Sequence, residues 1–282
     1  MTPKYSIVLV NYSKPEMATY GILSWLLQES KVPYEVVLLH CTDYEEKIRE
    51  LVDRHKPDNC NFKIYDINKP KYFNLAAFRN LGAYYAEGER LCFASVDIVR
   101  RRDFIDQIDN STDHNCWVSA GSFHIPIHTQ YFKDIDYYSK KHTFDKAIIK
   151  VAAKNNLTHT LDYGTAFVNK EHFVNFGGYG DSLLFHEDAH IDMRANEYFK
   201  RRGSKHPIER TTDVTKYPGV KLKGRKKIDM HTHGMLIEHA DKKAARKILK
   251  TVDKHEETLV FDKPLNLDES YLMERIYRHK CD

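Results

Sequence analysis

The first candidate for chemistry is a carboxylate, Asp97, in the short segment Ser95-Val96-Asp97. This segment directly follows the apolar residues 90–94, which are typical of a buried strand. A hard carboxylate in that position can hold Mg²⁺ or Mn²⁺ facing a diphosphate. The alternative is an Asp that caps a helix beginning near residue 103 or only stabilises a turn.

A second group of candidates begins a predicted helix at Glu187 and Asp188. The helix dipole and capping favour carboxylates there, so a purely structural role also explains them. The functional alternative is a general base that removes a proton from an acceptor hydroxyl. Arg194 lies two helical turns further along the same face and can orient an acid. His186 and His190 flank the acids, where they contact either an acceptor or solvent.

Three histidines, His231, His233 and His239, surround the apolar segment 235–238. Their spacing would place them on one face of a short strand. Neutral imidazole is a frequent metal ligand, but such a group is equally compatible with polar surface.

The elements that position these residues alternate along the first hundred positions. We predict strands at 5–10, 35–39, 62–65 and 90–94. We also predict three helices: the first starts at Pro15, the second runs from a cap at Asp43 to about Arg54, and the third runs from Asn74 to Glu87 and is ended by Gly88. This alternation predicts a mostly parallel sheet with right-handed crossovers. Ligands bind beyond the carboxyl ends of strands in such sheets. Asn11, Tyr12, His40 and the 95–97 turn all lie at such ends, so we expect a site there.

The remainder of the chain is less regular. We expect short strands near Trp117, a strand at 163–168, a helix from 187 to 202 ending at Gly203, a mobile loop over 203–229, and amphipathic helices at 241–252 and 268–279. We therefore expect one α/β domain over residues 1–240 and a small helical extension over 241–282.

Composition is that of a globular protein, with 41% hydrophobic and 30% charged residues and a net charge of +4. The five cysteines form no Cys-x-x-Cys pair, which is typical of reduced thiols.

The first residues lack a signal-peptide layout, and no apolar run reaches the length of a membrane span. We expect a cytoplasmic protein, with peripheral contact to a membrane surface as an option. Basic clusters at 100–102, 200–202 and 221–227 are expected to be solvated faces or to hold an anionic acceptor.

Several common site motifs are absent from the sequence. It has no Gly-x-Gly-x-x-Gly after a strand and no Gly-x-x-x-x-Gly-Lys phosphate loop. It also lacks Gly-x-Ser-x-Gly and His-Glu-x-x-His. A bound nucleotide would therefore need a metal at its diphosphate.

Five segments together resemble the glycosyltransferase family 2-like pattern on the GT-A fold, in the family's order and at its separations. They are Val-Leu-Val-Asn-Tyr-Ser-Lys-Pro at 8–15, Ala-Phe-Arg-Asn-Leu-Gly-Ala at 77–83, the turn at 95–97, Phe173 with Gly-Gly-Tyr-Gly at 177–180, and Glu-Asp-x-His-x-x-x-Arg at 187–194. The later segment around His239 is similar to the metal-binding segment of β-1,4-galactosyltransferase-like enzymes. The resemblance covers roughly residues 5–245.

The resemblance implies a nucleotide-sugar-dependent hexosyl or pentosyl transferase, with a UDP-sugar as the most common donor. It implies that the donor contacts Asn11, Tyr12, His40, Arg79, Ser95, Val96 and Asp97. Mn²⁺ or Mg²⁺ would be bound by Asp97 and His239, with His233 as the rival ligand. Asp188 would be the base of an inverting reaction, supported by Glu187 and Arg194. His186, His190 and Tyr179 would contact a glycan or glycoconjugate acceptor.

Two departures from the pattern keep alternatives open. Ser95 stands where the family has the first Asp of Asp-x-Asp, and His40 stands where an Asp usually follows the second strand. A retaining enzyme, a non-catalytic sugar-nucleotide-binding scaffold, a nucleotidyltransferase and a transferase with a nucleic-acid acceptor are the other interpretations. The missing N-terminal Gly-rich, Lys-containing loop argues against the nucleotidyltransferase.

Overall fold

The computed structural model describes residues 2–12, 15–71, 73–100, 102–111, 115–120, 123–126, 165–180, 187–205, 208–211, 220–223 and 263–277. In chain order the elements are β1 (Tyr5–Asn11), α1 (Pro15–Leu26), β2 (Tyr34–His40), α2 (Glu45–His55), β3 (Cys60–Asp66), α3 (Leu75–Tyr85), β4 (Arg90–Ser95), β5 (Ile98–Val99), α4 (Phe104–Ser111), β6 (Trp117–Ala120), β7 (Phe123–Pro126), β8 (Thr165–Asn169), α7 (Lys170–Asn175), α8 (Glu187–Arg201), β9 (Ile208–Thr211), β10 (Val220–Lys223) and α12 (Glu269–Tyr277). The predicted strand–helix alternation over residues 5–95 is confirmed.

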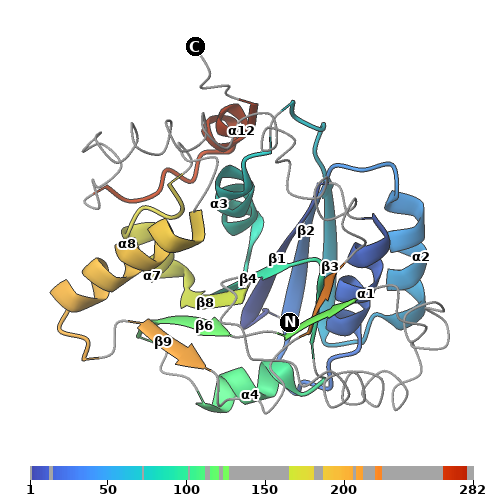
Figure 1. The fold of residues 1–282 in the computed structure, drawn as a ribbon, viewed down its shortest axis with the longest axis horizontal. Helices are drawn as coiled ribbons and strands as arrows, with labels where there is room; N and C mark the ends of the chain where they lie inside the picture. The colour runs from blue at the N-terminus through green and yellow to red at the C-terminus, as the bar shows by residue number, and fades with distance from the viewer. Residues whose placement is uncertain are drawn as a thin grey trace.

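The main sheet has the strand order β3-β2-β1-β4-β8-β6-β9. The pairs β3–β2, β2–β1 and β1–β4 are parallel, as the crossover helices require. Strand β8 then runs antiparallel to both β4 and β6. A second, three-stranded sheet has the order β5-β10-β7. The predicted mostly parallel α/β sheet is therefore confirmed, and Figure 1 shows the helices that flank it.

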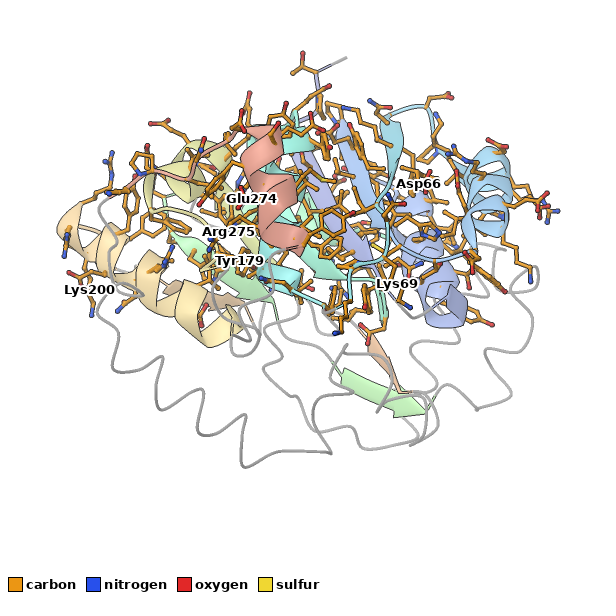
Figure 2. All side chains as sticks on the ribbon, turned by 90° about the horizontal axis from the view of Figure 1, so that it is seen from above. Asp66, Lys69, Tyr179, Lys200, Glu274 and Arg275 are labelled. Carbon is orange, nitrogen blue, oxygen red and sulfur yellow. The ribbon has the colours of Figure 1, made fainter. Side chains whose placement is uncertain are left out.

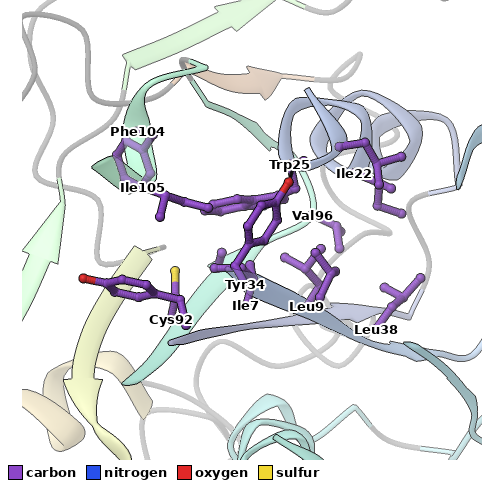
Figure 3. Packing of buried hydrophobic residues seen from close by; sticks show 14 of the residues in the cluster. Ile7, Leu9, Ile22, Trp25, Tyr34, Leu38, Cys92, Val96, Phe104 and Ile105 are labelled. Carbon is purple, nitrogen blue, oxygen red and sulfur yellow. Dashed lines mark hydrogen bonds between the residues drawn. The ribbon is translucent and has the colours of Figure 1, made fainter. Parts of the chain in front are cut away.

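Alternating residues of β1 separate the two apolar layers. Ile7 and Leu9 pack with residues of α1, α2 and α4, while Val8 packs with residues of α3, α7 and α8. Figure 3 shows the first of these layers, in which Trp25 of α1 meets Phe104 of α4 edge to face at 5.9 Å between ring centroids. Both faces of the central strands are thus covered, and polar side chains reach a ligand only at the strand ends.

Three expectations about local structure were wrong. Residues 203–229 contain the strands β9 and β10, because β9 pairs with β6 and β10 pairs with β5 and β7. Helix α2 has Tyr44 rather than Asp43 at its N-cap, with no side-chain cap. Helix α3 ends before Ala86, whereas Gly88 lies so close to β1 that a Cβ atom there would stand 2.6 Å from the hydroxyl of Ser6.

The expectation of a solvated basic face is wrong for Arg100 and Arg102, which are 1% and 4% exposed. The guanidinium of Arg100 lies over the rings of Trp25 and Phe104 and donates to the hydroxyl of Thr165. Arg102 pairs with Glu29 at 3.6 Å. These cations stabilise the packing of α1 against α4 and are not available to an anionic acceptor.

Four of the five cysteines, Cys41, Cys60, Cys92 and Cys116, are buried free thiols, while Cys281 lies outside the described residues. Within the described ranges, no helix has the length and apolar character needed to cross a membrane.

A buried carboxylate, Glu35, ties together the amino ends of the strands. It is fully buried, accepts hydrogen bonds from Ser6 Oγ and the Glu87 amide at 2.5 Å each, and pairs with Lys63 at 2.8 Å. Burial alone raises the pKa of Glu35, but the hydrogen bonds from Lys63, Ser6 and Glu87 outweigh it and leave the pKa below its ordinary value of 4.5. The charged form is therefore the one that the fold stabilises.

We expect Glu35→Gln to lower the free energy of unfolding at pH 7 by about 2–3 kcal/mol, because charged hydrogen bonds are lost around a buried group. Since the folded-state pKa is depressed, this contribution is present above pH 4.5 and is lost as the pH falls through the lower folded-state value. Urea unfolding at several pH values should show a gap between wild type and variant that narrows on acidification. The control is Glu87→Gln, since that carboxylate is 63% exposed and pairs with the same lysine; an equal loss in both variants would contradict the account.

Candidate functional site

Strands β2, β1 and β4 end side by side, which brings the predicted polar residues to one rim. Asn11 is the register partner of His40, and Val10 is the partner of Ser95. Tyr12 and Asp97 follow these ends directly. The convergence that the sequence predicted is therefore present in the structure.

His40 joins the ends of β1 and β2 through both ring nitrogens. The side-chain amide of Asn11 donates to Nδ1 at 3.3 Å, so the ring proton is on Nε2, which donates to the hydroxyl of Thr42 at 3.2 Å. Burial lowers the pKa of His40, and the carboxylate of Asp66 only partly opposes this. The ring is thus neutral at pH 7 and fixes the geometry of the rim.

Tyr12 is held by the loop that follows β3. Its hydroxyl donates to the carbonyl of Pro70 at 2.9 Å, and its ring stacks on Phe73 at 4.5 Å between centroids. The ammonium of Lys69 lies 4.8 Å from the same ring centroid. Tyr12 is only 9% exposed. The structure therefore places this ring in the wall of the site, with Lys69 over its face.

A cleft of about 950 Å³ opens beside these residues, between α2 and the ends of β2 and β3. It is lined by His40, Cys41, Thr42, Asp43, Glu45, Glu46, Arg49, Glu50, Asp53, Asp66, Ile67, Asn68 and Lys69. Most of the charged side chains here are carboxylates, which accept hydrogen bonds from hydroxyl and ring N–H groups. A diphosphate would be repelled by them. The cleft therefore suits a nucleoside better than a phosphate group.

The turn at Ser95-Val96-Asp97 connects the main sheet to β5 and packs against helix α1. Val96 is 4% exposed within the first apolar layer (Figure 3), and its carbonyl oxygen would lie 1.9 Å from a Cβ atom on Gly21 of α1. Only glycine allows α1 to approach the turn so closely. Asp97 is 3% exposed and Ser95 is half-buried. The carboxylate is thus buried just beyond the end of β4.

Arg79 on α3 lies against Tyr179. Its guanidinium is 4.9 Å from the centroid of the Tyr179 ring. The side chain of Asn80 donates to the Tyr179 carbonyl and accepts from the Tyr179 amide, both at 2.9 Å. Tyr179 is only 2% exposed, so it contributes to the site by supporting Arg79 rather than through an open surface.

Arg194 of α8 holds the adjoining glycine turn. Its Nη1 atom donates to the carbonyls of Gly177 at 3.1 Å and Gly178 at 3.2 Å. Both glycines have positive φ, and a Cβ atom on Gly178 would lie 2.7 Å from the Asn80 side-chain oxygen. This part of the structure links α3, the glycine turn and α8, and it gives Arg194 a positioning role.

Several predicted residues are described only in part. Glu187, Asp188 and His190 lie on the backbone of α8, whose first residue is Glu187, but their side chains are outside the described set. His186, His233 and His239 lie entirely outside the described residues.

Of the three expected metal ligands, the structure describes only one. Within the described ranges, no three His, Cys, Asp or Glu side chains lie close enough together to hold a metal ion. Asp97 alone among the expected ligands belongs to those ranges. One buried carboxylate at a strand end fits Mg²⁺ or Mn²⁺ held mainly through substrate phosphates, because such ions need only one or two protein carboxylates.

Sequence reasoning missed four supporting residues. They are Gly21, Lys69, Asn80 and Phe73, each of which contacts a predicted site residue. Asn80 had a signal in the sequence, because it lies next to Arg79 in the segment 77–83. The other three act through contacts that are distant in the chain.

No protein-family model matches the sequence, and the search of curated proteins gives no match. Solved structures do match. S. aureus TarS residues 1–349, in complex with UDP-GlcNAc, superposes with a TM-score of 0.56 at 16% identity over 97% of this chain and 70% of that chain. The mannosyltransferase PcManGT from Pyrobaculum calidifontis, in complex with GDP-Man and Mn²⁺, gives a TM-score of 0.54 at 15% identity over 100% of this chain and 71% of that chain.

The chain has a GT-A fold. A second TarS structure is matched over 90% of this chain but only 43% of its own. At these identities the likeness establishes the architecture alone. On the GT-A fold of this chain the polar residues at the ends of β1, β2 and β4 are Asn11, His40 and Asp97, while Arg79 lies on α3 against Tyr179.

Proposed function

We propose that this chain is a glycosyltransferase that moves a sugar from a nucleoside-diphosphate sugar to a hydroxyl of a glycan or glycoconjugate. The observation that carries the proposal is the rim of the GT-A sheet. There the cleft and the buried carboxylate of Asp97 lie at the ends of neighbouring strands, and the buried cation of Arg79 lies on α3. The donor ligands named for TarS and PcManGT, UDP-GlcNAc and GDP-Man, support a donor of this class.

The donor would lie with its two ends in different surroundings. Carboxylates of the cleft would accept hydrogen bonds from the base and ribose, with a UDP-sugar as the leading donor. The diphosphate would lie toward Asp97 and Arg79, away from those carboxylates. Arg79 is suited to a phosphate contact because its guanidinium is positioned by Tyr179.

A divalent ion would complete the donor site. We propose Mn²⁺ or Mg²⁺, bound by Asp97 together with His239 or His233 and the donor phosphates. Such an ion neutralises the charge that develops on the departing diphosphate. The Mn²⁺ named with PcManGT supports this assignment.

The acceptor would approach from the side of α8. We propose Asp188 as the general base that removes the proton of the acceptor hydroxyl in an inverting reaction. Glu187, His186 and His190 would contact the acceptor. Arg194 and Tyr179 would support this side by holding the glycine turn and Arg79 in place. We keep the division into a GT-A domain over residues 1–240 and an extension over 241–282 as part of the proposal.

A non-catalytic sugar-nucleotide-binding protein is the second candidate. Ser95 favours it, because this hydroxyl replaces a metal-binding carboxylate of the family pattern. The basic residues at 100–102 no longer favour a nucleic-acid acceptor, because Arg100 and Arg102 are buried.

A thermal-shift screen of nucleotide sugars with and without Mn²⁺, followed by product analysis, tests the proposal. A donor at 100 times its Kd should stabilise the chain by about 2.7 kcal/mol. Stabilisation by one donor, with release of its nucleoside diphosphate in the presence of an acceptor, is the expected result. Stabilisation without any turnover would favour the binding protein, and no stabilisation by any donor would overturn the proposal.

A further inference from the structure

The C-terminal residues 263–277, here called the C-terminal strap, run across α3 from one side of the site to the other. Near their start, the amide of Leu265 donates to the carbonyl of Val174 at 2.8 Å, and the Leu265 side chain lies against Gly178. Near their end they form α12. Figure 1 shows α12 packed beside α3, and Figure 2 shows it between α8, marked by Lys200, and Asp66.

Helix α12 is part of the folded core. Its Leu272 and Ile276 are 1% and 2% exposed and pack with Phe78 and Leu81 of α3. The hydroxyl of Tyr85 donates to the carboxylate of Glu269 at the first turn of α12. The position of α12 relative to the sheet is therefore fixed.

The last residue of α12 reaches the wall of the cleft. The hydroxyl of Tyr277 donates to the carbonyl of Asn68 at 2.9 Å, and both Asn68 and Lys69 line the cleft. Burial, and next the nearby thiol of Cys41, raise the pKa of Tyr277, so the hydroxyl stays protonated and remains a donor. The hydroxyl can therefore donate this hydrogen bond at neutral pH.

Segment 67–70 is held at three points by different parts of the chain. The Ile67 amide donates to the carbonyl of His40 at 2.8 Å, and the carbonyl of Pro70 accepts from Tyr12. Tyr277 supplies the third contact, at the middle of the segment. Between the first and the last of these points, the Tyr277 hydroxyl contacts the backbone one residue before Lys69.

We propose that Tyr277 is a positioning residue of the donor cleft: through its hydrogen bond to Asn68 it sets the position of the wall that receives the nucleoside. This inference rests on the proposed function, because it names a residue of the same site. A wall that is already ordered binds its ligand more tightly, since less conformational freedom is lost on binding. Removing one neutral hydrogen bond should weaken nucleotide binding about fivefold.

The test compares Tyr277→Phe with Tyr271→Phe, an identical change on the same helix. Tyr271 is 38% exposed and does not line the cleft. UDP and GDP are titrated by calorimetry, and hydrogen exchange is measured at the Ile67 amide without ligand. We expect Tyr277→Phe to raise the Kd for the nucleotide about fivefold and to raise the KM for the donor, with kcat retained. Hydrogen exchange at the Ile67 amide should be faster than in wild type. The melting temperatures of Tyr277→Phe and Tyr271→Phe should be equal.

The outcomes separate this inference from the proposed function. If wild type binds UDP or GDP and Tyr277→Phe binds it equally well, the inference is overturned and the proposed function stands. If wild type binds neither nucleotide, the inference is overturned, while the proposed function is decided by the screen of all donors. Equal weakening in Tyr271→Phe would also overturn the inference, because the effect would then belong to α12 as a whole.

Discussion

Replacing Asp97 with Asn should abolish sugar transfer, with a loss of at least about 10³-fold in kcat/KM. The amide keeps the shape of the side chain but removes the charge and one oxygen suited to a hard cation. Stabilising charge on the departing diphosphate is worth several kcal/mol, and each 1.36 kcal/mol changes the rate tenfold. The turn itself should survive, because it is fixed by Val96 in the apolar layer and by the close approach of Gly21.

The matched control for Asp97 is Ser95→Ala in the same turn. Ser95 is half-buried and its hydroxyl is a poor metal ligand, so we expect a loss of about tenfold or less. Rates are measured with the donor found in the screen, and folding is checked by circular dichroism. Turnover of Asp97→Asn within tenfold of wild type would show that this carboxylate does not serve the diphosphate.

Asp188→Asn should lower kcat by about 10²- to 10⁴-fold, which is the usual contribution of general base catalysis. Donor affinity should stay at the wild-type value, because α8 packs near β6 and β9 while the cleft lies at the ends of β2 and β3. Figure 1 shows α8 and α2 at opposite sides of the sheet. Calorimetry and single-turnover rates measure the two effects separately.

Glu197→Gln provides the control for Asp188. Glu197 is a half-exposed acid on the same helix, paired with Arg201 at 2.8 Å, and its removal should change stability only slightly and kcat not at all. A near-normal kcat for Asp188→Asn, or a parallel loss of donor affinity, would reject its assignment as the base.

The first half of the fold could be predicted because its signals are local. The apolar runs of β1, β2 and β4 and the helices between them follow directly from periodicity and turn residues. Strands β9 and β10 could not be predicted in this way. Both are four residues long, and they exist because of pairing with β6 and with β5 and β7, which are distant in the sequence.

The site was predictable to the same extent. Strand ends at 11, 40 and 95 meet because parallel strands share an edge, which the alternation alone implies. Most supporting contacts were not predictable, since Lys69 with Tyr12 and Tyr277 with Asn68 join residues far apart in the chain. The burial of Arg100 was also not predictable. Three adjacent arginines are typical of an exposed surface, whereas the rings that cover Arg100 belong to α1 and α4.

Hydrogen exchange with and without the donor selected by the screen, read at single amides, tests the central claim most directly. The claim is that a nucleotide sugar binds at the ends of β1, β2 and β4. We predict slower exchange on donor addition at residues 11–12, 40–43, 66–69 and 95–97. Protection confined to other parts of the chain, or none at saturating donor, would contradict the account.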